Sequence, residues 1–292
     1  MRDNRTLKQL LVNADDFGLC RGVTDGILEG HQQGIVTSTS IMATGDAFAY
    51  AASQLPSNPK LNVGVHLTLV EEGPACDPAQ IPTLVQPDGR LPKNYSALLL
   101  GVVLGRVRLR DIERELRAQI EKCVAAGLQP THLDSHQHVH ALPTLFKLVV
   151  RLAQEYKIRG IRIPRDSTRW RGSRSGSFLQ TAPKTGLCWL ARYDGRALPQ
   201  GLVACDQMVG LFDSGSLTED CLLQIIELLP EGTTELVSHP GRTDAETAKY
   251  SHWKYNWVTE LKALTSTRVR EALVARNVQL VSYRGLASQL RQ

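Results

Sequence analysis

The chain has 292 residues, with 42% hydrophobic and 22% charged side chains, so it can bury a sizeable core and is expected to be globular. Its net charge of +5 comes without any block of Lys and Arg, which argues against nucleic acid as a partner. The six cysteines are scattered without a CxxC pair, a pattern that favours reduced thiols over a disulfide framework. The first residues lack the apolar run of a signal peptide, and the most apolar segment, 97–105, is too short to span a bilayer. We therefore expect a cytoplasmic protein.

Strand-length apolar runs alternate with segments of helical periodicity along the chain. The predicted strands are 9–16, 35–43, 62–69, 131–136, 160–164, 234–240 and 278–284. The predicted helices are 22–33, 111–126, 141–156, 217–229 and 257–276. This alternation is typical of parallel strands joined by right-handed crossovers, and about seven strands predict an α/β fold, a distorted TIM-like β/α barrel. An open doubly wound sheet is the alternative, although no GxGxxG or GxxxxGK[ST] motif follows any strand.

Residues 1–292 are interpreted as a single domain, because no repeat or linker interrupts them. Two stretches break the alternation of strands and helices. Residues 70–94 are rich in Pro, Gly and acidic side chains, and residues 166–215 are irregular with several aromatic and arginine side chains. Long loops in a compact domain are usually functional, so both stretches are expected to form the rim of the barrel.

Polar residues stand at the carboxyl ends of four predicted strands. They are Asp15 and Asp16, His66, Asp134 and His136, and Ser238 and His239. In a β/α barrel these strand ends lie on one face, where the loops build the active site, so the side chains should converge. Each has an ordinary interpretation, such as a helix N-cap for Asp16 or a core histidine for His66, but these do not explain why all of them fall at strand ends.

Four of the eight histidines fall in the stretch THLDSHQHVH at 131–140. The strand is expected to end near Ser135, so His136 is the first histidine to reach the rim, while His138 belongs to the following loop. One metal ligand with supporting neighbours is therefore favoured over four ligands. Asp134 is a candidate to accept a hydrogen bond from the second ring nitrogen of a ligand histidine.

Asp16, His66 and His136 together offer one oxygen and two nitrogens, a set that suits one divalent metal ion and leaves positions for water and substrate. These ligands favour Zn²⁺ or another transition ion, because Mg²⁺ prefers more oxygen ligands.

Four motifs of the chain resemble those of the YdjC-like carbohydrate deacetylases, a family that includes chitooligosaccharide and hopanoid-associated glycolipid deacetylases. The motifs are NADDFG (13–18), GVHLTL (64–69), THLDSHQHVH (131–140) and SHPG (238–241), in matching order. The resemblance implies a barrel of the glycoside hydrolase/deacetylase type and removal of N-acetyl groups from an amino sugar. It also implies one divalent ion, Zn²⁺ or Mg²⁺, held by Asp16, His66 and His136.

For hydrolysis of an acetamide we assign Asp15 as general base, on the hypothesis that a bend at the strand end brings both carboxylates to the site. Proximity to the metal should keep Asp15 ionised. His239 is the preferred general acid, with His138 as the alternative. Arg162 and Arg165 are expected to bind substrate hydroxyls or to orient a carboxylate, and the alternative is that they form surface ion pairs.

The substrate is expected to be an N-acetylated amino sugar, either a free oligosaccharide or a lipid-linked one, and the pattern of 71–91 resembles the hopanoid-associated branch. Residues 97–110 combine an apolar run with three arginines. This segment either rests peripherally on the inner membrane face or is a buried helix with a solvated end, and the second interpretation is favoured.

Trp170 and Trp189 either stack on sugar rings or belong to the core. A homodimer is the commonest state for an oligomer. The competing functions are metal-dependent hydrolysis of another amide or a phosphoester on the same barrel, and non-catalytic sugar binding.

Overall fold

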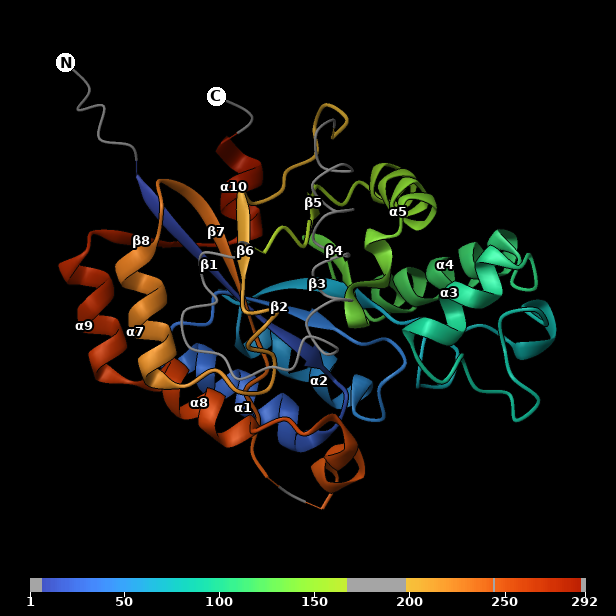
Figure 1. Ribbon diagram of the computed structural model, residues 1–292, viewed down its shortest axis with the longest axis horizontal. Helices are drawn as coiled ribbons and strands as arrows, with labels where there is room; N and C mark the ends of the chain where they lie inside the picture. The colour runs from blue at the N-terminus through green and yellow to red at the C-terminus, as the bar shows by residue number, and fades with distance from the viewer. Residues whose placement is uncertain (1–6, 167–197, 244, 290–292) are drawn as a thin grey trace.

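The computed structural model describes residues 7–166, 198–243 and 245–289 of the chain, and their centre is a parallel β-sheet (Figure 1). The strands are β1 (Lys8–Phe17), β2 (Ser38–Ile41), β3 (Asn62–Leu67), β4 (His132–Ser135), β5 (Gly160–Ile161), β6 (Gln207–Val209), β7 (Gly232–Ser238) and β8 (Val278–Val281). Along the sheet the order is β5-β4-β3-β2-β1-β7-β6, and β8 pairs with the first half of β1. All of these pairings are parallel.

The sheet curls toward closure. Two isolated parallel bridges, Gly160–Val203 and Asp166–Met208, join the chain around β5 to the chain around β6, the strands at opposite ends of the strand order. Residues 10–17 of the central strand β1 are all buried, as expected for a parallel strand covered on both faces. The result is a barrel-like α/β fold in a single domain, as the sequence predicts.

Helices surround this sheet (Figure 1). They are α1 (Arg21–Gln32), α2 (Phe48–Gln54), α3 (Tyr95–Val103), α4 (Leu109–Ala125), α5 (Pro143–Glu155), α7 (Glu219–Leu228), α8 (Trp257–Thr265), α9 (Thr267–Ala275) and α10 (Tyr283–Gln289). Short 3₁₀ segments are η1 (Leu55–Ser57), η2 (Pro78–Gln80), η3 (His136–Ala141) and η6 (Thr247–Trp253). Within the described part of the chain, no helix combines the length and the apolar character that crossing a membrane requires.

The long helix α4 illustrates why the periodic pattern predicts a helix. Ile112, Leu116 and Ile120 recur at a spacing of four and are buried against the sheet. Asp111 stands in the first turn and Lys122 in the last, where each charge opposes the partial charge of the helix terminus.

The structure differs from the sequence prediction at short or interrupted elements. The predicted helix 257–276 is two helices, because Ser266 is extended and caps α9 by accepting the backbone N–H of Val269. The stretch 166–215, expected to be irregular, contains the strand β6. Residues 167–197 of that stretch, with Trp170 and Trp189, lie outside the described residues.

Candidate metal centre

The end of β1 is bent at Asp16, which has a positive φ of 67°. The register between β1 and β2 shifts between Ala14 and Phe17 at the same place. Successive residues of a regular strand point to opposite faces, so a local change of backbone direction is needed for two adjacent side chains to reach one site. Aspartate adopts the left-handed region more readily than most residues. The bend that the sequence hypothesis requires for Asp15 and Asp16 is therefore present.

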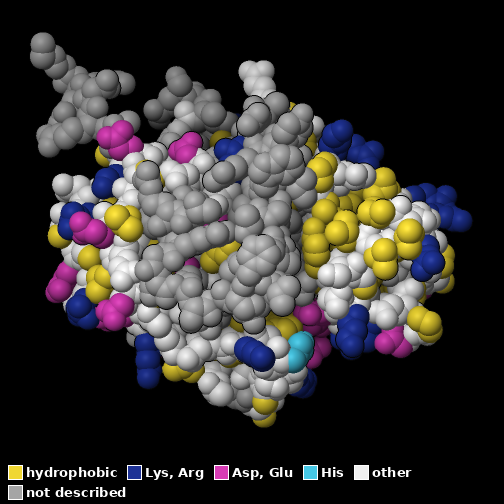
Figure 2. Space-filling view, in the orientation of Figure 1, with side chains coloured by type: hydrophobic (Ala, Val, Ile, Leu, Met, Phe, Trp, Pro, Cys, Tyr) yellow, Lys and Arg dark blue, Asp and Glu magenta, His cyan; other side chains and the backbone are white. Residues whose placement is uncertain are grey.

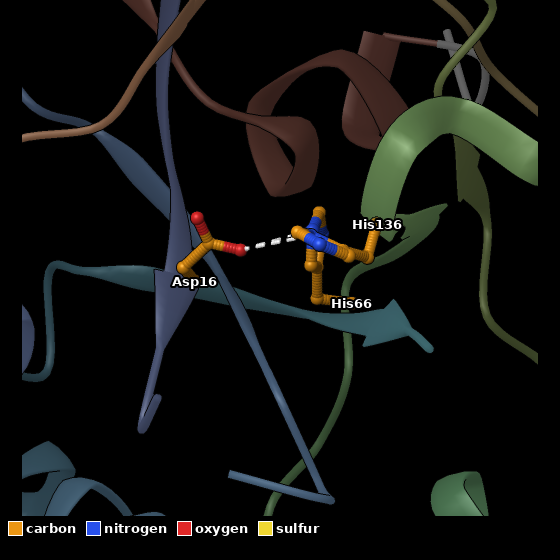
Figure 3. Close-up of side chains that lie close together, drawn as sticks. All are labelled: Asp16, His66 and His136. Carbon is orange, nitrogen blue, oxygen red and sulfur yellow. Dashed lines mark ion pairs between the residues drawn. The ribbon is translucent and has the colours of Figure 1, made fainter. Parts of the chain in front are cut away.

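Asp16, His66 and His136 lie together and are buried (Figure 3). His66 comes from β3 and His136 is the first residue after β4. Asp16 Oδ1 lies 3.4 Å from His66 Nε2 and 3.3 Å from His136 Nδ1. Of the four histidines in 131–140, His136 alone belongs to this group among the described residues.

This group has the properties of a metal site. One ligand atom from each residue can be chosen so that all lie within 4.8 Å of one another. Both carboxylate oxygens of Asp16 are buried, and apart from the two imidazoles no group among the described residues is placed to hydrogen-bond them. A buried carboxylate without hydrogen bonds is unfavourable unless a cation satisfies it. One carboxylate oxygen and two imidazole nitrogens suit a divalent ion with positions left for water and substrate.

The electrostatic environment also favours positive charge here. Burial by itself would lower the pKa of His66, but Asp134 and Asp15 outweigh burial and raise this pKa to about 10. Burial opposes protonation of His136 as well, yet Asp16 and Glu71 raise its pKa to about 9. The carboxylates thus attract a cation, and a metal ion would replace the protons that the two rings otherwise hold.

Each ligand histidine presents its second nitrogen to another carboxylate. His66 Nδ1 lies 2.9 Å from Asp134 Oδ1, the contact that the sequence suggested. His136 Nε2 lies 3.2 Å from Oε2 of Glu71, a residue that the sequence analysis missed. Such outer carboxylates fix the tautomer and orientation of metal-binding histidines. Glu71 follows β3 closely, so the search for polar residues at strand ends could have found it by extending a few residues beyond Leu69.

Arg162 is fully buried and organises the carboxylates beneath the site. Its Nη1 and Nη2 donate to the two oxygens of Asp15 at 2.7 Å each. Nη1 also lies 2.8 Å from Asp134 Oδ2, and Nε donates to Glu235 Oε1 at 2.9 Å. The interpretation of Arg162 as a surface ion pair is therefore wrong, and the structure shows the guanidinium holding the carboxylate of Asp15. A contact of Arg162 with substrate hydroxyls stays a prediction.

The carboxylate of Asp15 is held ionised. Burial alone would raise its pKa, but Arg162 holds the pKa well below its usual range. The side-chain amide of Asn13 donates a further hydrogen bond to Asp15 Oδ1 at 2.8 Å. Asp15 still borders the cavity described next, so the carboxylate is both fixed in place and accessible from that cavity.

A cavity of about 380 Å³ lies at this face of the sheet. The described residues that line it are Asp15, His66, Tyr95, Ser135, His136, Gln137, His138, Leu211, Ser214, His239, Trp253 and Tyr255. Trp253 also lines a second cavity of about 760 Å³, together with Glu71 and Glu72. The Trp253 ring centre lies 4.9 Å from that of His136, so this indole forms a wall between the metal centre and the larger cavity.

His239 and His138 both border the smaller cavity, but their environments differ. Burial lowers the pKa of His239, while the carboxylates of Asp16 and Asp15 oppose this shift. Burial and the charge of Arg162 together lower the pKa of His138 well below its usual range. His239 therefore takes up a proton more readily than His138, which favours it as the proton donor.

The other two histidines of 131–140 and the predicted Arg165 do not belong to the group of Asp16, His66 and His136 among the described residues. The ring of His132 stacks on Tyr283 with centres 3.9 Å apart, and His140 lies 2.5 Å from the Ser135 hydroxyl, so both have structural partners. Arg165 accepts a backbone hydrogen bond from Met208 at 3.3 Å. It is not among the described residues that line the cavity, and its contact with substrate stays a prediction.

Comparison with known proteins places these motifs in a family. Residues 9–275 match the family model described as YdjC-like protein. The chain is 35% identical over 277 residues to a carbohydrate deacetylase from Geobacillus stearothermophilus, covering 94% of this chain and 96% of that protein. It is 31% identical to a carbohydrate deacetylase from Brevibacillus brevis, covering 94% and 98% of the two chains.

A solved structure agrees with this match. An Enterococcus faecalis protein named as a candidate cellobiose-phosphate cleavage protein superposes with a TM-score of 0.74 at 28% identity, covering 96% of this chain and 99% of that one. The matched range includes Asp16, His66, His136 and His239. The chain belongs to the YdjC-like family.

Proposed function

We propose that this protein is a metal-dependent carbohydrate deacetylase that hydrolyses the N-acetyl group of an amino sugar. The observation that carries the proposal is the convergence of Asp16, His66 and His136, with Asp15 and His239 bordering the same cavity. The names of the Geobacillus and Brevibacillus relatives support the same reaction class. Asp16, His66 and His136 would hold the ion through one oxygen and two nitrogens.

When bound, the ion would polarise the acetyl carbonyl and lower the pKa of a coordinated water. Asp15 stays ionised because Arg162 lowers its pKa well below the usual range. Its fixed carboxylate can accept a hydrogen bond from the attacking water and take up the proton as the new C–O bond forms. Asp15 is thus assigned as the general base.

The departing amine needs a proton when the C–N bond breaks. His239 borders the cavity, and burial lowers its pKa, so its imidazolium would give up a proton readily. The proton lost by the water balances the one gained by the amine, and the products are acetate and the free amino sugar. His239 is therefore assigned as the general acid.

The test combines elemental analysis with an acetate-release assay. Purified protein is analysed for bound metal, stripped with a chelator, and reloaded with Zn²⁺ or Mg²⁺ before incubation with N-acetylglucosamine oligomers. Acetate release that disappears on stripping and returns on reloading is the expected result. Metal-loaded protein that binds the sugars without releasing acetate would instead support the sugar-binding alternative, and turnover of phosphoesters alone would support the second hydrolase alternative.

The surface at α3 favours a lipid-linked sugar as substrate, and this is our second proposal. Leu98 is buried, but the later part of the segment exposes Leu100 (56%), Val103 (72%), Leu104 (52%) and Leu109 (43%). Exposed arginines follow at Arg106, Arg108 and Arg110. Figure 2 shows hydrophobic side chains gathered on the flank that carries α3 and α5, with Lys and Arg at its margins. The first residue of α3, Tyr95, lines the active-site cavity.

An apolar surface bordered by arginines suits an anionic bilayer, and its position would bring a lipid-linked sugar to the cavity. The test is flotation with liposomes that contain anionic lipid, comparing the wild type with a triple change of Leu100, Val103 and Leu104 to Ser. We expect the wild type to float with the liposomes and the variant to remain in the bottom fraction of the gradient. Equal flotation of the two proteins would refute this proposal. Concentration-dependent dimerisation that the same changes abolish would instead assign the surface to another copy of the chain.

A further inference from the structure

The rim loop 70–94 brings a carboxylate to the outer side of the metal centre. Glu71 Oε2 lies 3.2 Å from His136 Nε2, while Nδ1 of the same ring faces Asp16 Oδ1 at 3.3 Å. A neutral imidazole that gives Nδ1 to a cation carries its hydrogen on Nε2. In that tautomer the Nε2–H of His136 donates to Glu71, and the hydrogen bond fixes the rotation of the ring.

The backbone at Glu71 is in a conformation that non-glycine residues adopt rarely, with a φ of 69°. Three hydrogen bonds from the far side of the same loop hold it there. The backbone N–H of Glu71 donates to Pro92 O at 2.9 Å, Arg90 Nη2 donates to Glu71 O at 2.6 Å, and the Leu91 N–H donates to Glu72 O at 3.1 Å. Unusual backbone conformations persist only where the surroundings determine them, and here they orient the Glu71 side chain.

Buried polar residues of α4 fix the chain on both sides of Glu71. The side-chain amide of Gln119 accepts from the Thr68 N–H at 2.8 Å and donates to Thr68 O at 2.6 Å. The carboxylate of Glu115 accepts from the backbone N–H groups of Ala75 and Cys76 at 2.8 and 2.9 Å. The loop at Glu71 is therefore tied to the helical framework before any ligand binds.

We propose that Glu71 is a positioning residue of the metal centre, which selects the Nε2–H tautomer of His136 and holds Nδ1 toward the ion. The inference rests on the proposed metal site and adds the residue that orients one of its ligands. Glu71 also lines the larger cavity beside Trp253. The same loop thus forms the wall of that cavity and orients a metal ligand.

The test compares three variants by their affinity for Zn²⁺, measured by competition with a chromophoric chelator. Glu71→Leu removes the acceptor, Glu71→Gln keeps a neutral acceptor, and Glu72→Gln is the matched control, since it removes a neighbouring carboxylate that also borders the larger cavity. Loss of an outer acceptor typically weakens metal binding by about 10- to 100-fold, which is expected for Glu71→Leu. A smaller loss of Zn²⁺ affinity is expected for Glu71→Gln, and the Zn²⁺ affinity of Glu72→Gln should equal that of the wild type.

A second measurement distinguishes a loss of the His136 ring orientation from a general loss of folded structure. In the Zn²⁺-loaded wild type, ¹⁵N-histidine spectra should show His136 with its hydrogen on Nε2 and slow exchange of that hydrogen with water. Glu71→Leu should exchange faster while its metal-free form keeps the circular dichroism spectrum of the wild type. Unchanged Zn²⁺ affinity and unchanged exchange in Glu71→Leu would overturn the inference. Failure of the wild type itself to bind Zn²⁺, Mg²⁺ or another divalent ion would instead overturn the proposed function.

Discussion

Replacement of Arg162 by Met should reveal how strongly the carboxylates beneath the metal site repel one another. In the wild type the guanidinium contacts Asp15, Asp134 and Glu235, and all four side chains are buried. Removing one partner of a buried ion pair typically destabilises a protein by about 3–5 kcal/mol, because the remaining charge stays buried and unpaired. With an unfolding entropy of about 2 cal/mol/K per residue, this corresponds to a fall in melting temperature of about 5–8 °C for this chain.

The destabilisation should depend on pH in a direction that the pKa values determine. In the wild type, Arg162 lowers the pKa of Asp15 below that of the unfolded chain, so this carboxylate adds stability above about pH 4, which is lost as pH falls. Without Arg162, burial raises the pKa of the same carboxylate above the unfolded value. The Arg162→Met variant should therefore recover stability as pH falls, and its deficit should be smaller at about pH 5 than at about pH 8.

The assay is thermal unfolding of chelator-treated protein followed by circular dichroism, because a bound cation would offset part of the lost positive charge. Arg110→Met serves as the control, since the Arg110 side chain is 68% exposed and its removal should leave the melting temperature unchanged. A melting temperature of Arg162→Met equal to that of the wild type, or a deficit that grows toward low pH, would refute the reasoning.

Three further outcomes are expected. Asp15→Asn should lower acetate release by about 10²- to 10⁴-fold with metal content unchanged, and retained activity would remove Asp15 from the mechanism. In metal-free protein the two ligand histidines have pKa values raised to about 10 and about 9, above the unfolded value, so stability should decline as pH rises through about 9 in unfolding experiments. Metal-loaded protein should lack this decline. Gly26→Ala would place a Cβ 2.3 Å from the backbone of Gly241, the last residue of the SHPG motif. It should lower both melting temperature and turnover, whereas the Cβ of Gly73→Ala meets no atom of the described residues within 4 Å and should lower neither.

The strand ends that carry the site could be predicted because the information is local. Alternation of apolar strands and periodic helices predicts parallel strands, and parallel strands place their carboxyl ends on one face. Asp16, His66 and His136 follow from that rule, and the resemblance of their motifs to the YdjC-like family gives the same set. The strand β6 was missed because it is only Gln207–Val209, too short to show a period of two.

The contacts that Arg162 and Glu71 make around the candidate metal site could not be assigned from the sequence. The interpretation of Arg162 stayed open between substrate, carboxylate and surface because its contact with Asp15 spans 147 positions of sequence. Glu71 was overlooked because the direction of its side chain depends on a left-handed backbone that Arg90, Leu91 and Pro92 hold in place. Neither contact can be recognised from the periodic pattern of residues within a short segment of the sequence.

The sequence by itself determined which strands end in polar residues, the family and the candidate ligand set. All three depend on residue spacing within short segments. Only the tertiary structure decided which nitrogen of each ring faces Asp16, that Arg162 is enclosed by carboxylates, and that Glu71 reaches His136. The physical reason is that a strand period specifies the face on which a side chain lies, whereas ion pairs and hydrogen bonds require contact between atoms that only packing brings within about 3 Å.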